Sequence, residues 1–312
     1  MHELTHSKRP LIIGIGGGGD VVGALALAEH CRLYYGADPI VGGVAWERRP
    51  IDPVPGPRRA DEIEGASEIA PAVLAAGPQT KVAGRDVRFA EARVAELLGV
   101  QVVLLDLNVG PRRLADGLAI AAERVNADLI VFLDVGGDVL AHGDEPGLGS
   151  PLCDAVMLAA ADMLREAGVP VVGAIFGIGC DGELTPGEVL DRLSEVGQMG
   201  GLAGAVGLTA EVAALLERAV EAVPTEASAQ ALHAFHGARG EIPIRDGRRT
   251  VILSAVAVVT FFFGVGEALA SAARLALAVR DAGDLDEANA TLQSLGIRSE
   301  LDWERDAAHR PD

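Results

Sequence analysis

Residues Leu11–Ala28, LIIGIGGGGDVVGALALA, join a short apolar strand to a helix through a run of glycines and one aspartate. The glycines fit the G-x-G-x-x-G spacing of a nucleotide-binding turn. Glycine has no Cβ, so the backbone can turn tightly and approach a ligand closely. The N–H groups at the start of the following helix favour an anion, commonly a phosphate. We therefore expect a small anionic metabolite or nucleotide here. The residues expected around it are Gly14, Gly16, Gly17, Gly18, Gly19 and Asp20.

Short apolar runs alternate with helical patterns along most of the chain. This alternation predicts a Rossmann-like α/β fold, an open, mostly parallel sheet with helices on both faces. We expect one α/β domain over residues 1–312, with a helical insertion at about 185–238 and a C-terminal helical hairpin at about 264–298. Strands are expected at 11–15, 40–46, 101–106, 129–135, 170–176 and 250–262. Helices are expected near 20–34, 86–98, 113–125, 151–167, 186–196, 210–222 and 225–236.

Composition narrows the class of protein. The net charge of −19 argues against a nucleic-acid partner, because phosphate backbones are held by clusters of Lys and Arg. The longest apolar run, residues 251–263, is too short to span a bilayer, so no membrane partner is expected. The N-terminus has no apolar signal segment, and the three cysteines form no CxxC pair, which favours a cytoplasmic protein. Alanine-rich faces at 265–280 would permit a homo-oligomer.

Polar residues follow several of the expected strands. In parallel sheets, ligands bind beyond the carboxyl ends of the strands, so these residues are expected to meet at one rim. The block Asp134–Asp154 gathers five acids and five glycines directly after a buried strand. Carboxylates on such a backbone suit Mg²⁺, and Asp134 and Asp138 are the expected metal ligands. Alternatively, these acids cap neighbouring helices, and Asp154 in particular favours a helix N-terminal dipole.

Further candidates complete the expected site. Asp181 and Glu183 follow the fifth strand and, together with Asp138, are the candidate catalytic groups for proton transfer. Arg48 follows the second strand and can hold an anion. The glycines that could approach a ligand after the fourth strand are Gly136 and Gly137. Cys153, in the first turn of an expected helix, is interpreted as a buried thiol rather than a nucleophile.

A nicotinamide cofactor is the alternative ligand. An NAD(P) site needs an acidic residue about 20 positions after the glycines to bind the ribose hydroxyls. Glu47 ends the second strand, but it lies 28 positions after Gly19, and a loop rich in proline and arginine follows it. Asp20 at the start of the helix would also repel a pyrophosphate unless a cation intervened. NAD(P) is therefore the second choice after Mg²⁺.

Several long motifs together resemble an uncharacterised prokaryotic family known only as a domain of unknown function. They occur in the order GIGGGGDVVGALALA, GVAWERRPIDPVPGPR, DVGGDVLAHGDEPGLGSPLCDAVMLA, GCDGEL, PTEAS and LGIRSELDWE. The resemblance extends from Leu11 to about Glu304 and implies a single α/β unit. It implies no activity and no catalytic residues.

The residues themselves predict an enzyme that performs Mg²⁺-assisted phosphoryl transfer or hydrolysis, a transferase or hydrolase acting on a phosphorylated or nucleotide-like metabolite. The chain has no G-x-S-x-G, H-E-x-x-H or G-K-[ST] motif, which argues against serine hydrolases, zinc proteases and P-loop enzymes. Two alternatives stay open. One is an NAD(P)-dependent oxidoreductase, and the other is a non-catalytic nucleotide-binding sensor with a partner surface at 185–238.

Overall fold

The computed structural model describes residues 1–245 and 247–309. Within these residues, nine strands form one sheet in the order β3-β4-β5-β2-β1-β6-β7-β11-β8, and β9 and β10 form a separate antiparallel pair. The strands are β1 Pro10–Gly14, β2 Ile40–Val44, β3 Ile63–Ala70, β4 Val73–Val82, β5 Val102–Leu105, β6 Leu129–Val135, β7 Val171–Phe176, β8 Leu202–Gly207, β9 Gly240–Ile244, β10 Arg249–Leu253 and β11 Val259–Phe263.

Helices connect most of these strands and also make up the C-terminal part of the described chain. They are α1 His2–His6, α2 Asp20–His30, α3 Ala90–Leu98, α4 Gly110–Val125, α5 Pro151–Glu166, α6 Pro186–Gln198, α7 Ala210–Ala222, α8 Ala227–Phe235, α9 Val265–Leu269, α10 Arg274–Val279, α11 Leu285–Ser294 and α12 Glu300–Ala308. Among the described residues, no helix combines the length and apolar character needed to cross a membrane.

The five central strands, β5-β2-β1-β6-β7, are parallel, which confirms the predicted Rossmann-like class. β1 and β6 are buried along their whole length because their aliphatic residues face helices on both sides. The chain first adds β2 on one side of β1 and later returns to place β6 on the other side. The strand order therefore reverses between β1 and β6, and a crevice outside the carboxyl ends is expected at such a point.

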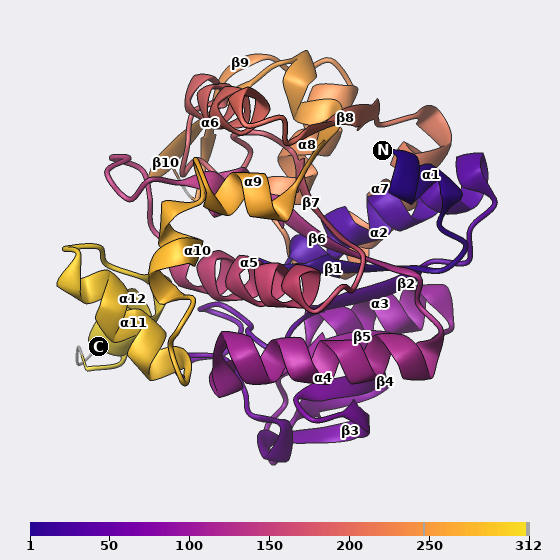
Figure 1. Ribbon diagram of the computed structural model, residues 1–312, viewed down its shortest axis with the longest axis vertical. Coiled ribbons are helices and arrows are strands. Elements are labelled where there is room, and N and C mark those ends of the chain that lie inside the picture. Colours follow the sequence, from indigo (N-terminus) through magenta and orange to yellow (C-terminus); the bar gives the residue numbers. More distant parts are fainter. Residues whose placement is uncertain (246, 310–312) are drawn as a thin grey trace.

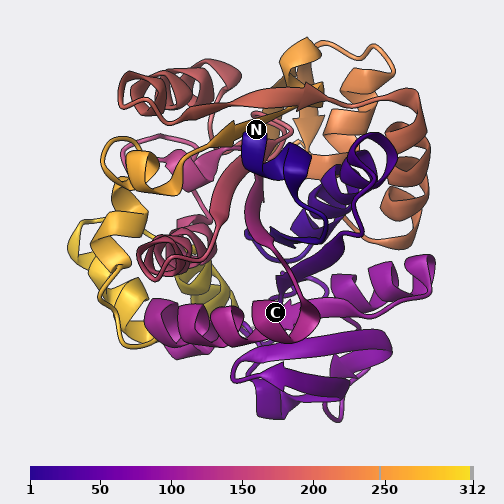
Figure 2. The same cartoon turned by 45° about the vertical axis from the view of Figure 1, so that its right-hand side comes forward.

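Two layers of helices cover the sheet (Figure 1, Figure 2). α4 and α5 pack in one apolar core, while α2, α3, α7 and α8 pack in the other. The C-terminal helices α9 to α12 all pack against α5, and α9 also contacts β7. This arrangement brings α12 close to the start of α5, and thus to the rim where β1 and β6 end.

Several predicted elements differ in the structure. The interval 185–238 was predicted as a helical insertion, but it contains β8, which pairs with β11 at the edge of the main sheet. The interval 250–262, predicted as a single strand, contains two strands in different sheets. β10 pairs with β9, and β11 pairs with β7 and β8. The predicted hairpin at 264–298 is instead three short helices, α9 to α11. The alanines at 265–280 pack largely inside the chain, so the homo-oligomer stays a prediction.

The hairpin of β3 and β4 was not predicted. Gly65 has φ +77° and lies at a register irregularity, and Pro78 interrupts the β4 sequence. Both features break the period-two alternation by which strands are recognised in a sequence. They are tolerated because the hairpin forms the edge of the sheet, where fewer ladder hydrogen bonds are required.

Candidate functional site

The glycine loop after β1 makes the tight turn that its sequence predicts. A Cβ on Gly14 would lie 2.4 Å from the carbonyl carbon of Asp20, and Gly17 and Gly18 have positive φ angles. The Asp20 carboxylate folds back over the loop, where its Oδ2 accepts hydrogen bonds from the N–H groups of Gly16 at 2.9 Å and Val135 at 3.3 Å. One loop amide that could have bound a phosphate is thus already bound to a carboxylate.

The loop after β6 supplies two further carboxylates. Oδ2 of Asp134 accepts hydrogen bonds from the N–H groups of Gly137 at 2.9 Å and Val139 at 3.2 Å. Asp138 begins a short 3₁₀ turn and is 6% exposed. Its carboxylate accepts no hydrogen bond from any described residue. Gly136 and Gly137 have φ of 140° and 118°, a left-handed region that favours glycine and lets the loop turn back toward β7.

Asp154 contributes a third carboxylate from the first turn of α5. It is 2% exposed, and its Oδ1 has no hydrogen-bond partner among the described residues. One oxygen from each of Asp20, Asp134 and Asp154 lies within 4.8 Å of the others, and we call these three residues the first acidic group. Three segments that are far apart in the sequence thus converge where the strand order reverses.

A second acidic group consists of Asp138, Asp181 and Glu183, whose ligand atoms also lie within 4.8 Å of one another. Oδ1 of Asp181 accepts a hydrogen bond from the Glu183 N–H at 3.3 Å. Glu183 is more fully bound. It accepts hydrogen bonds from the N–H groups of Gly149 and Ser150 and from the Ser150 hydroxyl, and it pairs with Arg249 at 3.3 Å.

Burial dominates the electrostatics of this rim. It raises the pKa of Asp20 to about 7 and that of Asp181 to about 8. It also raises the pKa values of Asp134, Asp138 and Asp154 well above the usual range, and the charges of neighbouring carboxylates raise them further. Asp138 is affected by Asp154, a member of the other group, so the two groups act on each other.

Arg48 reaches the rim, but it already forms ion pairs with two acids of α12. Its Nη2 donates to the Gly16 carbonyl at 2.7 Å and lies 3.3 Å from Glu300, while the guanidinium stacks on Trp46. Glu300 also accepts the N–H groups of Leu152 and Cys153 at the start of α5. The position where an external anion was expected thus holds a carboxylate of the chain itself. The motif LGIRSELDWE contains Glu300, but nothing in its sequence indicates this contact.

Glu47 and Cys153 have structural contacts. The Glu47 carboxylate accepts the N–H of Ala90 at the start of α3, and burial raises its pKa to about 7. This contact caps a helix and leaves Glu47 less suited to bind a ribose. The Cys153 thiol is buried and donates to the Ile15 carbonyl at 2.9 Å, and burial raises its pKa well above the usual range. It is the buried thiol that the sequence predicts.

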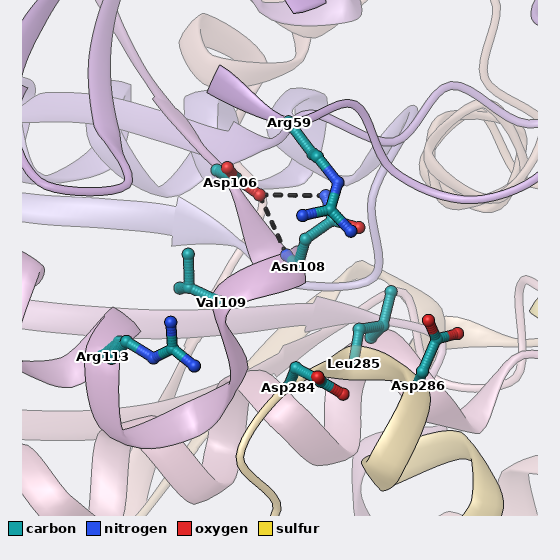
Figure 3. A pocket seen from close by; sticks show the side chains of 8 residues that line it. All are labelled: Arg59, Asp106, Asn108, Val109, Arg113, Asp284, Leu285 and Asp286. Carbon is teal, nitrogen blue, oxygen red and sulfur yellow. Dashed lines mark hydrogen bonds between the residues drawn. The ribbon is translucent and has the colours of Figure 1, made fainter. Parts of the chain in front are cut away.

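Asp106, after β5, does not join either acidic group. It lines a separate hollow of about 140 Å³ between the starts of α4 and α11, together with Arg59, Arg113 and Asp284 (Figure 3). Its two oxygens accept the N–H groups of Ala60 and Asn108. The predicted rim therefore collects the residues after β1, β6 and β7, but not those after β5.

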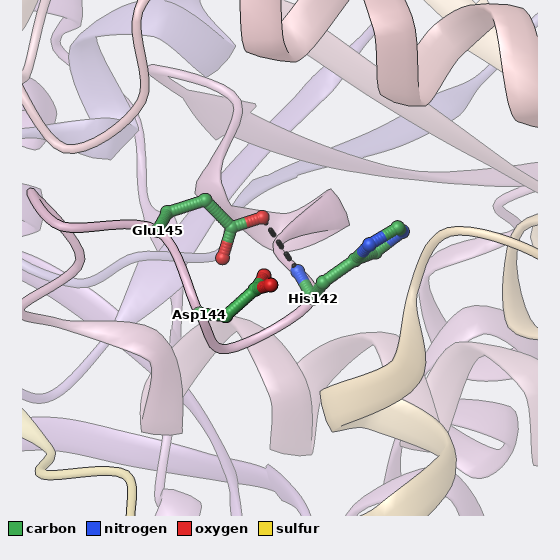
Figure 4. A group of neighbouring side chains, drawn as sticks. All are labelled: His142, Asp144 and Glu145. Carbon is green, nitrogen blue, oxygen red and sulfur yellow. Dashed lines mark hydrogen bonds between the residues drawn. The ribbon is translucent and has the colours of Figure 1, made fainter.

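His142, Asp144 and Glu145 form another group with ligand spacing, in the loop between β6 and α5 (Figure 4). The Glu145 carboxylate accepts the N–H groups of His142 and Gly143, both at 2.8 Å, and pairs with Arg192 at 3.2 Å. The His142 ring contacts Glu195 at 2.9 Å. Because these bonds already satisfy Glu145 and His142, we interpret this group as a clamp on the loop.

Comparison with known families agrees with the motifs. A sequence model described as "Protein of unknown function (DUF1152)" matches residues 11–308. The chain belongs to this family. Searches of curated proteins and of solved structures found no match. The family carries no assigned activity, so its function is argued from the rim itself.

Proposed function

We propose that this DUF1152 protein is an enzyme that binds a phosphorylated or nucleotide-like small metabolite at the rim and uses Mg²⁺ to transfer or hydrolyse a phosphoryl group. The observation that carries the proposal is the unpartnered Asp154 Oδ1, buried against Asp20 and Asp134. An isolated buried carboxylate is costly unless an opposite charge meets it. A divalent cation supplies that charge in a site made of oxygen atoms.

The rim also suits the substrate that such a cation would bring. Mg²⁺ is commonly bound by one or two carboxylates together with substrate phosphates, whose charge it neutralises. A cation bound between a phosphate and the Asp20 carboxylate would then offset the repulsion between these two negative charges. Two amides of the glycine loop could bind a phosphate oxygen, because those of Gly17 and Gly19 donate to no acceptor among the described residues.

Proton transfer is assigned to Asp181 on geometric grounds. Its half-buried carboxylate accepts a single long hydrogen bond from the described residues, whereas Glu183 is held by Ser150 and Arg249. In hydrolysis, the oxygen of water bonds to phosphorus as the bond to the leaving oxygen breaks. Asp181 would accept the proton that the water loses, and the leaving oxygen would gain one from solvent.

The proposal is tested by thermal unfolding and phosphate release with ATP, glucose 6-phosphate, NADH and NADPH, each with Mg²⁺ or with EDTA. We expect ATP or glucose 6-phosphate to stabilise the chain, and phosphate to be released from it, in Mg²⁺ but not in EDTA. Asp134→Asn should abolish both effects, and Asp144→Asn, an exposed acid of the same loop, should leave them unchanged.

Two other results would contradict the proposal. Stabilisation by NADH or NADPH in EDTA would favour the oxidoreductase. Binding without phosphate release, unaffected by Asp138→Asn combined with Asp181→Asn, would favour the sensor. No contact at the rim favours the oxidoreductase, because the Glu47 carboxylate, which would bind the ribose, caps α3 instead.

A further inference from the structure

The two aspartates expected to share one metal ion belong to different groups. Asp134 lies with Asp20 and Asp154, while Asp138 lies with Asp181 and Glu183. Asp181 packs closely against the loop between them: a Cβ on Gly136 would lie 2.4 Å from the Asp181 carboxyl carbon. The loop after β6 therefore delivers one acid to each group, four residues apart.

Each group contains a buried acid with unused oxygen atoms. In the first group this is Asp154, with its unpartnered Oδ1. In the second group it is Asp138, which is 6% exposed and whose carboxylate accepts no hydrogen bond from the described residues. These two acids come from different elements, the 3₁₀ turn after β6 and α5. The two observations are therefore independent, and each indicates a missing positive charge.

The charges at the rim favour more than one cation. The two groups contain six carboxylates, and one of these, that of Glu183, forms an ion pair with Arg249. Arg48 is paired with Glu300 and lies against the loop carbonyl of Gly16. One divalent cation balances two of the five remaining negative charges, and a second balances two more.

We infer that the rim binds two divalent cations, one held by Asp20, Asp134 and Asp154 and the other by Asp138 and Asp181, with Glu183 behind them. The inference rests on the proposed function and narrows its substrate class to phosphate esters or anhydrides, whose oxygens can contact both ions. Asp181 has two oxygens, so one can hold the second cation while the other accepts the proton of the attacking water.

The test counts Mn²⁺ ions bound to the full chain without substrate, by calorimetric titration and native mass spectrometry. We expect two ions for the wild type and for Asp144→Asn. Asp154→Asn should lose the first ion and keep the second, and Asp138→Asn should do the reverse. The electron paramagnetic resonance spectrum should show coupling between two Mn²⁺ ions in the wild type and a single uncoupled ion in each variant.

Other numbers of bound Mn²⁺ ions would contradict the inference, and each number would contradict a different part of it. One ion in the wild type overturns the second site but leaves Mg²⁺-assisted chemistry standing. Binding of no ion by the wild type overturns both. If the wild type binds two ions and both Asp154→Asn and Asp138→Asn lose the same one, the assignment to two groups is wrong. Near-ultraviolet circular dichroism checks that each variant is folded, and Asp181→Asn serves as a second variant for the Asp138 group.

Discussion

The acids of the rim and those of the loop at 142–145 have similar spacing but opposite surroundings. Each of the three groups offers three ligand atoms within 4.8 Å of one another. In the loop, Arg192 and two amides meet the charge of Glu145. At the rim, Oδ1 of Asp154 has no partner among the described residues, and Asp138 is 6% exposed and receives no hydrogen bond from them. Proximity of acidic side chains therefore does not distinguish a ligand site from a structural clamp; uncompensated charge does.

The largest difference between the two regions is expected in the pH dependence of stability. Without metal, unfolding of the chain should require less free energy at pH 8 than at pH 5. The folded pKa values of Asp20 and Asp181 are raised to about 7 and about 8, whereas an unfolded Asp titrates near 3.9. Between these limits the folded chain binds more protons than the unfolded chain, so the free energy of unfolding falls as the pH rises.

Urea unfolding in EDTA between pH 5 and pH 8 checks this prediction. The loop acid Glu145 has a lowered pKa, so its contribution is lost below pH 4.5 and stays constant in this window. His30, whose pKa is lowered by burial, acts in the opposite direction below pH 6.5 and reduces the slope slightly. Saturating Mg²⁺ should reduce the fall in stability, because the cation binds the ionised carboxylates. A stability that is constant in EDTA would contradict the raised pKa values of Asp20 and Asp181 in the folded chain.

The same contrast explains what could be predicted from the sequence. Carboxyl ends of parallel strands meet at one edge, so residues after β1, β6 and β7 could be placed together from their positions alone. Asp20, Asp134, Asp138 and Asp181 do lie there. Their division into two groups depends on the left-handed turn at Gly136 and Gly137, which is a property of the folded backbone.

Long-range contacts escaped prediction for a different reason. The sequence around Asp154 indicates a helix N-terminus and does not reveal that one oxygen lacks a partner. Glu300 lies about 250 residues from Arg48, and its contact depends on how α12 packs against α5. The sequence predicts that Arg48 binds an external anion, whereas in the structure its Nη2 already binds Gly16 and Glu300. Local patterns identify where acids gather, but they do not identify what compensates them.

The second prediction concerns the loop. Glu145→Gln should lower the free energy of unfolding by about 1–3 kcal/mol, because Arg192 loses its buried partner and the charged hydrogen bonds of two amides are weakened. Urea unfolding at pH 7 measures the change. The neighbouring Asp144→Asn is the control, and as an exposed substitution it should stay within about 0.5 kcal/mol. If Glu145→Gln also removed a bound Mn²⁺ ion, the clamp interpretation of the loop would be wrong.

The third and smallest effect has the opposite sign. Asp154→Asn should raise the stability of the metal-free chain by about 1 kcal/mol at pH 8, because an unpaired buried carboxylate is costly whether it is ionised or held protonated above its usual pKa. Urea unfolding in EDTA measures the gain. Asp162→Asn provides the matched comparison, since Asp162 is also a buried acid of α5 but is paired with Arg165 and Arg280, and its substitution should destabilise.

Addition of Mg²⁺ should then reverse the order of wild type and Asp154→Asn. A ligand at one hundred times its dissociation constant stabilises a folded chain by about 2.7 kcal/mol, and the variant would lose that gain at the first acidic group. A variant that is more stable without the cation and less stable with it would show that the acid is maintained for binding rather than for folding. If Asp154→Asn destabilised the chain in EDTA as much as Asp162→Asn, Asp154 would have a compensating partner after all, and the distinction between rim and loop would fail.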